Sequence, residues 1–397
     1  MAERCFGSTG KLLPDGGGLY VHIAYCLRKC LYCDFFSAGV RIADWSRYVD
    51  ALCNELAHRS NELAWPLRTV YFGGGTPSLM PEEEFIRLST FLKPYMSDVE
   101  EFTIEVNPDD VDDHMIGVWK NGGVNRLSIG IQTFDDDALR AIGRRHDSKI
   151  AKEAYKRARN VFGNISIDLM FGLPGQSIEA WIKDIQTAIN MHPEHISAYS
   201  LMYEEGTALT ALRDSGRLME APEELSETMF TILVEELSRA GYDHYEISNF
   251  ALPGYRSRHN SSYWLQKPYI GLGPSAHSYD GLRERKSNRA TLNGYMGHWT
   301  MEYTDAYEQD DNITETETLS DEELREEYIL TRMRMREGIP LHDYRNRFGD
   351  RACIRLVKSC VQLADRGLVL INETHISLTE KAILLSDSVI LEIAANC

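Results

Sequence analysis

The sequence contains no long hydrophobic run, no low-complexity tract and no apolar signal core at its amino terminus. A membrane span needs about 18 consecutive apolar residues, so we expect no transmembrane segment and a cytoplasmic location, with peripheral membrane contact left open. Positive charge is also scarce, because 42 Lys and Arg against 60 Asp and Glu give a formal net charge of −18. A chain this acidic repels polyphosphates, and we expect no nucleic-acid partner.

Cysteine is sparse as well, with eight residues in a chain of 397. Without a secretory signal, these thiols are expected to stay reduced rather than form disulfides. Three of them, Cys26, Cys30 and Cys33, lie within eight residues of each other. The other five are scattered and need no special role. The cluster of three requires a chemical reason.

The first 250 residues repeat one pattern, in which a β-rich run is followed by a turn and a segment with helical spacing. Residues 19–25 and then 44–60 are the first example. Five more strands are expected at residues 69–72, 101–106, 126–131, 165–170 and 195–201, with helices from 81 and near 135–142, 148–162 and 178–191. Six βα units in succession predict a parallel sheet with helical crossovers. We therefore expect an α/β fold, closed as a partial (β/α)6 barrel.

The rest of the chain is less regular. Residues 222–240 predict a long helix and 242–250 one more strand, whereas residues 251–300 are rich in Gly, Pro and aromatic residues, as loops are. An acidic stretch at 308–327 is expected to be a linker that runs into a helix. Helices near 321–336 and 350–366, a hairpin at 367–378 and a last helix after Thr379 predict a small winged-helix-like α+β domain. The predicted divisions are a tail (1–15), the barrel (16–250), a loop-rich extension (251–310) and a C-terminal domain (311–397).

The cysteine loop follows the first strand, at the barrel end where working residues gather. Thiolates bind soft metals, and C-x3-C-x2-C spacing places three sulfurs around one centre. A closed zinc site needs a fourth ligand, for which His22 is the nearest candidate. Three sulfurs on a [4Fe-4S] cluster instead leave one iron open to a small molecule. The cluster is the favoured hypothesis, with structural zinc as the alternative.

This spacing resembles the signature of the radical S-adenosylmethionine (SAM) superfamily. Further motifs resemble its coproporphyrinogen-oxidase-like branch, in the order of that family: residues 20–26, 71–78, 127–134, 143–146 and 167–176. The tail of the chain resembles the small HemN-like carboxyl-terminal domain of the same branch. The resemblance implies a [4Fe-4S] cluster on the three cysteines and SAM on its open iron. It implies cofactor contacts at Tyr20, Tyr32, Gly74, Gly75, Thr76, Glu105, Gln132, Arg144 and Asp168.

Three features separate the oxidases of this branch from the related HemW proteins, which are regarded as haem chaperones. The oxidases resemble C-x3-C-x2-C-x-C, but here Asp34 and Phe35 follow Cys33, so that the fourth cysteine is absent. Only 25 residues precede Cys26, too few for the substrate-covering extension of the oxidases. Residues 259–264 match the H-N-x-x-Y-W motif of the chaperone group, and residues 271–277 fit it too. By this resemblance, His259 is a candidate ligand of haem iron.

The resemblance thus predicts a haem chaperone that passes haem to apo-haemoproteins and contains a SAM-binding [4Fe-4S] cluster. A haem donor and a homodimer stay open as partners. A coproporphyrinogen III oxidase and a radical SAM methyltransferase of haem breakdown are the alternatives. One departure is that Ala24 and Tyr25 stand where relatives usually have Pro-Phe. Because all three cysteines remain, we expect little chemical consequence.

Overall fold

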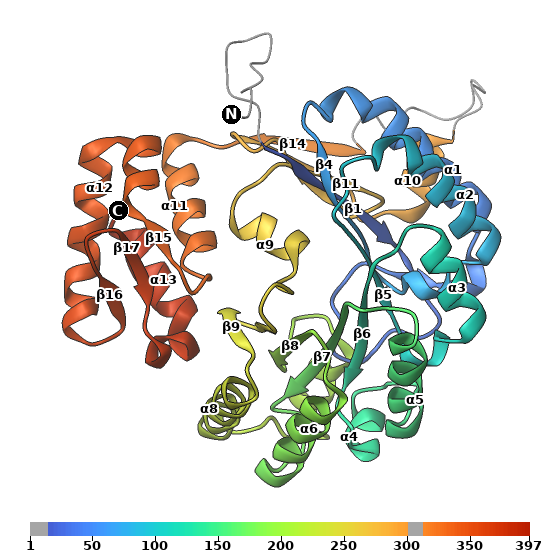
Figure 1. The fold of residues 1–397 in the computed structure, drawn as a ribbon, viewed down its shortest axis with the longest axis horizontal. Coiled ribbons are helices and arrows are strands. Elements are labelled where there is room, and N and C mark those ends of the chain that lie inside the picture. The colour runs from blue at the N-terminus through green and yellow to red at the C-terminus, as the bar shows by residue number, and fades with distance from the viewer. Residues whose placement is uncertain (1–14, 301–312) are drawn as a thin grey trace.

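A computed structural model describes residues 15–300 and 313–397. Its main sheet has twelve strands, in the order β14-β13-β12-β11-β1-β4-β5-β6-β7-β8-β10-β9. The six predicted strands are β1 (Gly17–Ile23), β4 (Leu67–Gly74), β5 (Glu101–Val106), β6 (Arg126–Gln132), β7 (Ile165–Phe171) and β8 (His195–Ser200). Each pairs in parallel with the next, and Figure 1 shows them as an arc. The predicted α/β partial barrel is confirmed.

Helices cover the outer face of this arc (Figure 1). They are α1 (Trp45–Arg59), α2 (Glu82–Leu92), α3 (Asp113–Asn121), α4 (Asp136–Ala141), α5 (Ser148–Arg159), α6 (Ile178–Met191) and α8 (Glu223–Arg239), whereas α7 (Ala208–Asp214) lies against the cysteine loop, where Leu209 N donates to Leu31 O. Several begin at a side chain that caps the first turn: Asp44, Asp147 and Ser177 each accept a hydrogen bond from a backbone N–H three residues on. The predicted helices therefore start close to where the capping residues stand.

The alternation of side chains along each strand separates the apolar core from the functional face. In β6, Leu127, Ile129 and Ile131 are fully buried in the main hydrophobic core. Arg126 and Ser128 point the other way and line a cavity inside the arc. Because successive strand residues face opposite sides, one strand contributes side chains to the apolar core and to the cavity. The inner face is polar, and the core lies between the sheet and its helices.

The expected single strand at 242–250 is wrong, because this segment forms a hairpin. It consists of β9 (Asp243–Glu246) and β10 (Asn249–Ala251), and β10 pairs antiparallel with β8. The Glu246 carboxylate accepts hydrogen bonds from Ser248 N (3.0 Å) and Asn249 Nδ2, which fold the chain back on itself. A turn organised by a side chain leaves no glycine or proline signal in the sequence.

The segment 251–300 is not loop-rich, contrary to expectation. It contains α9 (Arg258–Trp264), β11 (Tyr269–Leu272), β12 (His277–Tyr279), β13 (Glu284–Asn288) and α10 (Leu292–Trp299). β11 pairs in parallel with β1, and β14 (Thr314–Thr318) pairs with β13. Strands of three to five residues are too short to show a period. The main sheet therefore continues past the division expected at residue 310, and residues 308–312 of the acidic stretch lie outside the described part.

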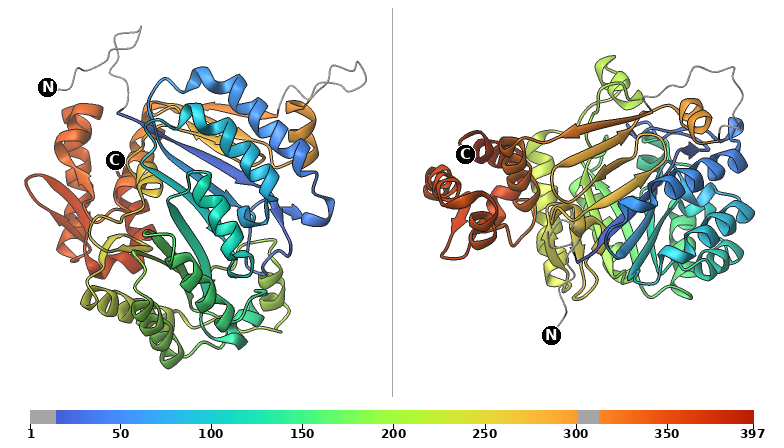
Figure 2. Two further views of the ribbon diagram at one scale, coloured as in Figure 1. Left: turned by 45° about the vertical axis from the view of Figure 1, so that its right-hand side comes forward. Right: turned by 90° about the horizontal axis from the view of Figure 1, so that it is seen from above.

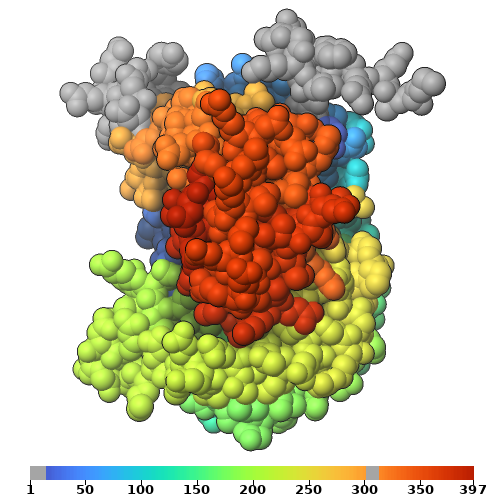
Figure 3. All heavy atoms as spheres, turned by 90° about the vertical axis from the view of Figure 1, so that its left-hand side faces the viewer, coloured from blue at the N-terminus to red at the C-terminus, as the bar shows by residue number. Residues whose placement is uncertain are grey.

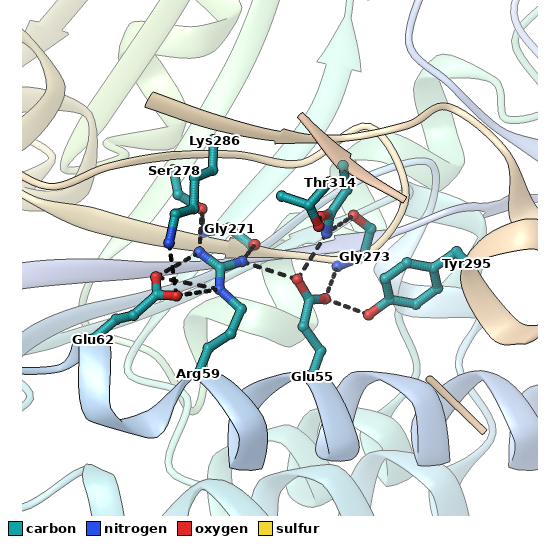
Figure 4. A network of polar contacts seen from close by, with 10 residues as sticks. Glu55, Arg59, Glu62, Gly271, Gly273, Ser278, Lys286, Tyr295 and Thr314 are labelled. Carbon is teal, nitrogen blue, oxygen red and sulfur yellow. Dashed lines mark hydrogen bonds and ion pairs between the residues drawn. The ribbon is translucent and has the colours of Figure 1, made fainter. Parts of the chain in front are cut away.

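A buried polar network fastens this added sheet to α1 (Figure 4). The Glu55 carboxylate accepts hydrogen bonds from Arg59 Nη1 (2.9 Å), Gly273 N (3.0 Å), Asn288 Nδ2 (2.8 Å) and Tyr295 OH (2.5 Å). Arg59 donates in turn to Gly271 O, Ser278 Oγ and Glu62. A fully buried carboxylate is tolerated because charge-assisted bonds satisfy it.

The C-terminal unit has its own core and a small sheet. Its elements are α11 (Asp321–Arg332), β15 (Ile339–Pro340), α12 (Leu341–Asp365), β16 (Val369–Ile371), β17 (His375–Leu378) and α13 (Ser386–Ala395). The strands pair in the order β15-β17-β16, which confirms the predicted hairpin. Figures 2 and 3 show this unit packed on one side of the barrel, where Arg336 N donates to Tyr245 O (3.0 Å). Nowhere in residues 15–300 or 313–397 is a helix both long and apolar enough to cross a membrane.

Candidate functional site

The cysteine loop is closed at its base by two contacts. β2 (Tyr25–Cys26) pairs with β3 (Ala38–Gly39), and Ala38 N donates to Ala24 O at 2.7 Å. His22 Nε2–H donates to Phe36 O at 2.8 Å, and its Nδ1 accepts from Tyr20 OH at 3.1 Å. Burial lowers the pKa of His22, so the ring is neutral. His22 therefore holds the loop shut, and the zinc alternative loses its candidate fourth ligand.

Two neighbouring side chains donate hydrogen bonds to the cysteine sulfurs. Thr76 Oγ1 lies 3.4 Å from Cys26 Sγ, and Arg144 Nη1 lies 3.4 Å from Cys30 Sγ. Burial, with some repulsion from the other two thiols, raises the pKa of Cys33 to about 11. Three adjacent thiolates thus need a cationic centre to hold them deprotonated.

The three thiols line one shared cavity. A [4Fe-4S] cluster offers each of them a separate iron and leaves the fourth iron open. This arrangement fits a cluster.

That cavity has a volume of about 530 Å³ and lies at the carboxyl ends of the parallel strands. Such a volume falls in the range of about 300–1,000 Å³ that is typical of small-molecule sites. The structure brings these predicted site residues to its wall: Cys26, Cys30, Tyr32, Cys33, Gly74, Gly75, Thr76, Glu105, Gln132, Arg144 and Asp168. Tyr20 and His259 are not part of the wall.

Glu105 lies at the centre of the cavity wall on β5. Its carboxylate accepts hydrogen bonds from Tyr71 OH (2.7 Å) and Gly74 N (3.3 Å). Burial raises its pKa to about 7, against the lowering by these donors. Gly74 has φ +104°, and a Cβ there would come within 2.4 Å of the His22 ring. Only glycine fits this turn, which brings a backbone N–H to the carboxylate.

Asp168 and Gln132 occupy the neighbouring strands. Asp168 accepts a hydrogen bond from Ser128 Oγ at 3.3 Å, and burial raises its pKa. Gln132 has φ +70° at an irregularity between β6 and β7. A non-glycine residue in the left-handed region is strained, and such strain is common where a side chain must be aimed at a ligand.

Arg144 connects the cysteine loop to β6. Besides Cys30, it donates from Nη2 to Asn107 Oδ1 (2.7 Å) and to Gly130 O (2.6 Å). Its Nε is buried without a partner in the described structure. A guanidinium held in this way next to the thiols is ready for a further acceptor, such as a ligand carboxylate.

His259 lies beneath the barrel, away from the cysteine loop. It is 1% exposed, and its ring stacks on Tyr71 with 5.0 Å between centroids. Its Nδ1 contacts Thr69 Oγ1 at 2.8 Å and its Nε2 contacts Tyr263 OH at 2.8 Å. Both ring nitrogens are therefore engaged with protein groups, and this structure does not present His259 as a ligand for haem iron.

The same motif closes the amino-terminal mouth of the barrel. The buried Glu101 carboxylate accepts from the backbone N–H groups of Arg258 and His259, both at 2.9 Å, at the start of α9. Trp264, at the end of this helix, packs on the Arg334 guanidinium 4.7 Å from its ring centroid. Of the motif, only Asn260 reaches the cavity wall. The sequence showed the residues of this motif but not that α9 places them at the amino-terminal end of the barrel.

Comparisons with known proteins agree with this geometry. Residues 20–188 match the family model described as "Radical SAM superfamily", and residues 319–385 match "HemN C-terminal domain". The chain is 36% identical to "Heme chaperone HemW" of Bacillus subtilis, over 93% of this chain and 97% of that protein. The chain belongs to the HemW family. It is also 32% identical to the HemW of Lactococcus lactis, over 95% of this chain and 97% of that one.

A solved structure gives the same fold for the whole HemW chain. The structure titled "Coproporphyrinogen III oxidase (HemN) from Escherichia coli is a Radical SAM enzyme" superposes with a TM-score of 0.80, covering 97% of this chain and 91% of that one. Sequence identity is 21%, so this likeness concerns the fold. Membership of the radical SAM superfamily implies SAM and a [4Fe-4S] cluster.

Several cavity residues were missed in the sequence, and those outside the cysteine loop include Arg126, Ser197, Tyr199 and Asn260. The first three occupy inward positions of β6 and β8, as the strand period would have shown. Asn260 belongs to the H-N-x-x-Y-W motif of the HemW group, but its direction depends on how α9 docks. These four residues lie on β6, β8 and α9 rather than on the cysteine loop.

Proposed function

We propose that this chain is a haem chaperone, which binds haem and passes it to apo-haemoproteins, and that its cavity holds a SAM-accessible [4Fe-4S] cluster on Cys26, Cys30 and Cys33. The observation that carries the proposal is its match to proteins named "Heme chaperone HemW" over 97% of their length.

The cofactor end of the cavity supports the proposal through its charges. When bound, the cluster supplies the electron for reductive cleavage of SAM. Arg144 offers a guanidinium to the SAM carboxylate, and Glu105, whose pKa burial raises to about 7, offers a carboxylate to its amino group. Thr76 and Arg144 donate hydrogen bonds to Cys26 Sγ and Cys30 Sγ.

The cavity mouth supports the proposal through its apolar rim. Phe35, which stands where the oxidases carry a fourth cysteine, is 62% exposed, and Met202 is 66% exposed; both line the cavity. Large apolar side chains left in water at a cavity mouth are typical of binding surfaces. A flat macrocycle with apolar faces fits such a rim, and aromatic rings pack well on it.

A haem-transfer experiment tests the proposal. Anaerobically reconstituted protein is loaded with haem, freed of excess haem and mixed with apomyoglobin as a generic acceptor, while the Soret band is followed. We expect about one haem per chain and transfer to the acceptor. Wild-type protein that fails to bind haem, or holds it without release, would contradict the proposal.

A pair of variants locates the haem. Phe35→Asp places a charge on the rim, whereas Ile42→Asp changes a side chain that is 72% exposed and does not line the cavity. We expect Phe35→Asp to weaken haem binding by about tenfold, from the loss of roughly 1.5 kcal/mol of apolar contact, and Ile42→Asp to leave it within twofold. Equal effects would place haem elsewhere.

Coproporphyrinogen III oxidase activity is the second candidate. The observation that favours it is the likeness of fold to the Escherichia coli oxidase across 97% of this chain. The two functions separate in one assay, because decarboxylation of coproporphyrinogen III requires SAM and a reductant and yields a product, whereas haem transfer does not change the porphyrin.

A further inference from the structure

Arg126 is a buried cation that the proposed cofactor contacts do not use. It begins β6 and faces inward, it is 2% exposed, and it lines the cavity. Its Nε is buried without a hydrogen-bond partner. Across residues 15–300 and 313–397, its guanidinium forms no ion pair and no hydrogen bond with another residue. Its guanidinium N–H donors are therefore without a protein acceptor in the described structure.

An arginine side chain in this position stays protonated and keeps its positive charge. The nearest acidic groups are Glu105 and Asp168, whose pKa values its charge lowers, although burial raises both on balance. Glu105 is already bonded to Tyr71 and Gly74, and Asp168 to Ser128. A buried guanidinium that no carboxylate approaches is costly unless a ligand supplies the missing anion.

Asn260 is the second observation. It lines the same cavity, and its side-chain amide makes no hydrogen bond within the described part of the chain. The start of α9, which carries it, is held by Glu101 and by the Ser257 cap, whose Oγ accepts from Asn260 N at 3.3 Å. An amide N–H and a guanidinium that line the same cavity form a set of donors that matches a carboxylate.

We propose that Arg126 and Asn260 form a carboxylate-binding subsite on the floor of the cavity. The floor lies near the amino ends of the strands, whereas the cysteine loop follows their carboxyl ends. A porphyrin could bring a carboxylate there through a propionate, whereas the single carboxylate of SAM is assigned to Arg144 at the cysteine-loop end. The subsite therefore rests on the proposed function.

Binding of esterified and free porphyrin tests the subsite. Dissociation constants for haem, for haem dimethyl ester and for SAM are measured on anaerobically reconstituted wild type, Arg126→Gln, Arg126→Lys and Arg157→Gln. Arg157 is the matched control, because it lies on the outer helix α5 and donates only to Val111 O. For a propionate ligand, Arg126→Gln weakens haem roughly tenfold to a hundredfold and leaves the dimethyl ester within twofold. Arg126→Lys is expected to weaken haem binding by an intermediate factor, because an ammonium keeps the positive charge but lacks the paired N–H donors of a guanidinium.

Each outcome bears on the subsite. A loss confined to SAM, or a haem dissociation constant that stays within twofold of wild type, overturns it. Ligand-free Arg126→Gln is expected to melt no lower than Arg157→Gln, because an unpartnered cation is removed. A drop of more than about 5 °C below that control would show that Arg126 has a structural partner and overturn the proposal. If wild type binds no haem, the proposed function fails; if wild type binds haem and Arg126→Gln binds it equally well, only the subsite fails.

Discussion

Replacing His259 by alanine tests the structure against the sequence motif. The motif predicts a lost haem ligand, whereas the structure predicts a lost structural contact beneath the barrel. Removing the ring leaves Thr69 Oγ1 and Tyr263 OH without their partner, at about 1–1.5 kcal/mol for each buried hydrogen bond. The lost stacking on Tyr71 and the remaining cavity add about 1 kcal/mol. We expect the free energy of unfolding to fall by about 3–4 kcal/mol.

The pH dependence of this loss follows from the pKa of His259. Burial lowers it to about 3, against an unfolded value of 6.5. The unfolded chain therefore binds a proton that the folded chain refuses, and wild-type stability falls as pH drops below 6.5. At pH 5 this costs wild type about 2 kcal/mol, which the alanine variant does not lose. The difference between the two proteins should shrink by that amount between pH 7.5 and pH 5.

Urea unfolding at both pH values, together with the haem spectrum at saturation, measures the prediction. His342→Ala is the control, because His342 is exposed and contacts only Asn346. We expect the control to stay within about 0.5 kcal/mol of wild type, and the Soret band of folded His259→Ala to be unchanged. A changed axial-ligand spectrum with stability within about 1 kcal/mol of wild type would refute the reasoning, because His259 would then be a ligand and not a structural residue.

Three further predictions follow from the geometry. Glu55→Gln should lower the free energy of unfolding by about 2–4 kcal/mol in urea, because the buried Arg59 loses one of its two carboxylate partners and keeps only Glu62; an unchanged midpoint would contradict the role of the network. Glu105 has a folded pKa of about 7, above its unfolded value of 4.5, so its ionisation opposes folding and SAM-free wild type should lose about 3 kcal/mol between pH 4.5 and 7. Glu105→Gln should make the melting temperature depend less on pH between 4.5 and 7. A pH dependence that parallels that of wild type would contradict the raised pKa of Glu105. Thr76→Val removes the donor to Cys26 Sγ and should lower the cluster's reduction potential by up to about 40 mV in a titration followed by electron paramagnetic resonance, whereas an equal or higher potential would argue against the hydrogen bond.

The parallel barrel was predictable because its strands and helices are long enough to show a period. The inner strands alternate between core residues such as Ile129 and cavity residues such as Ser128, and capped helices follow. The cysteine loop was predictable for a different reason, since three thiols within eight residues have few uses other than a metal centre.

The remaining features depend on contacts between distant segments. The strands β12 and β13 are too short for periodicity, and they are held by Glu55 and Arg59 from a helix some two hundred residues away in sequence. The motif around His259 has the composition of a haem site, but only the docking of α9 decides that Asn260 meets the cavity and His259 does not. Arg126 was not predicted as a site residue, because a charged residue at the start of a strand is normally at the surface.

One paired measurement tests the central claim most directly. A single anaerobically reconstituted preparation is titrated with haem, and a second portion is incubated with coproporphyrinogen III, SAM and a reductant. The account predicts about one haem bound per chain and no decarboxylated product. Product formation without stoichiometric haem binding would contradict it, and would make this HemW-family chain an oxidase.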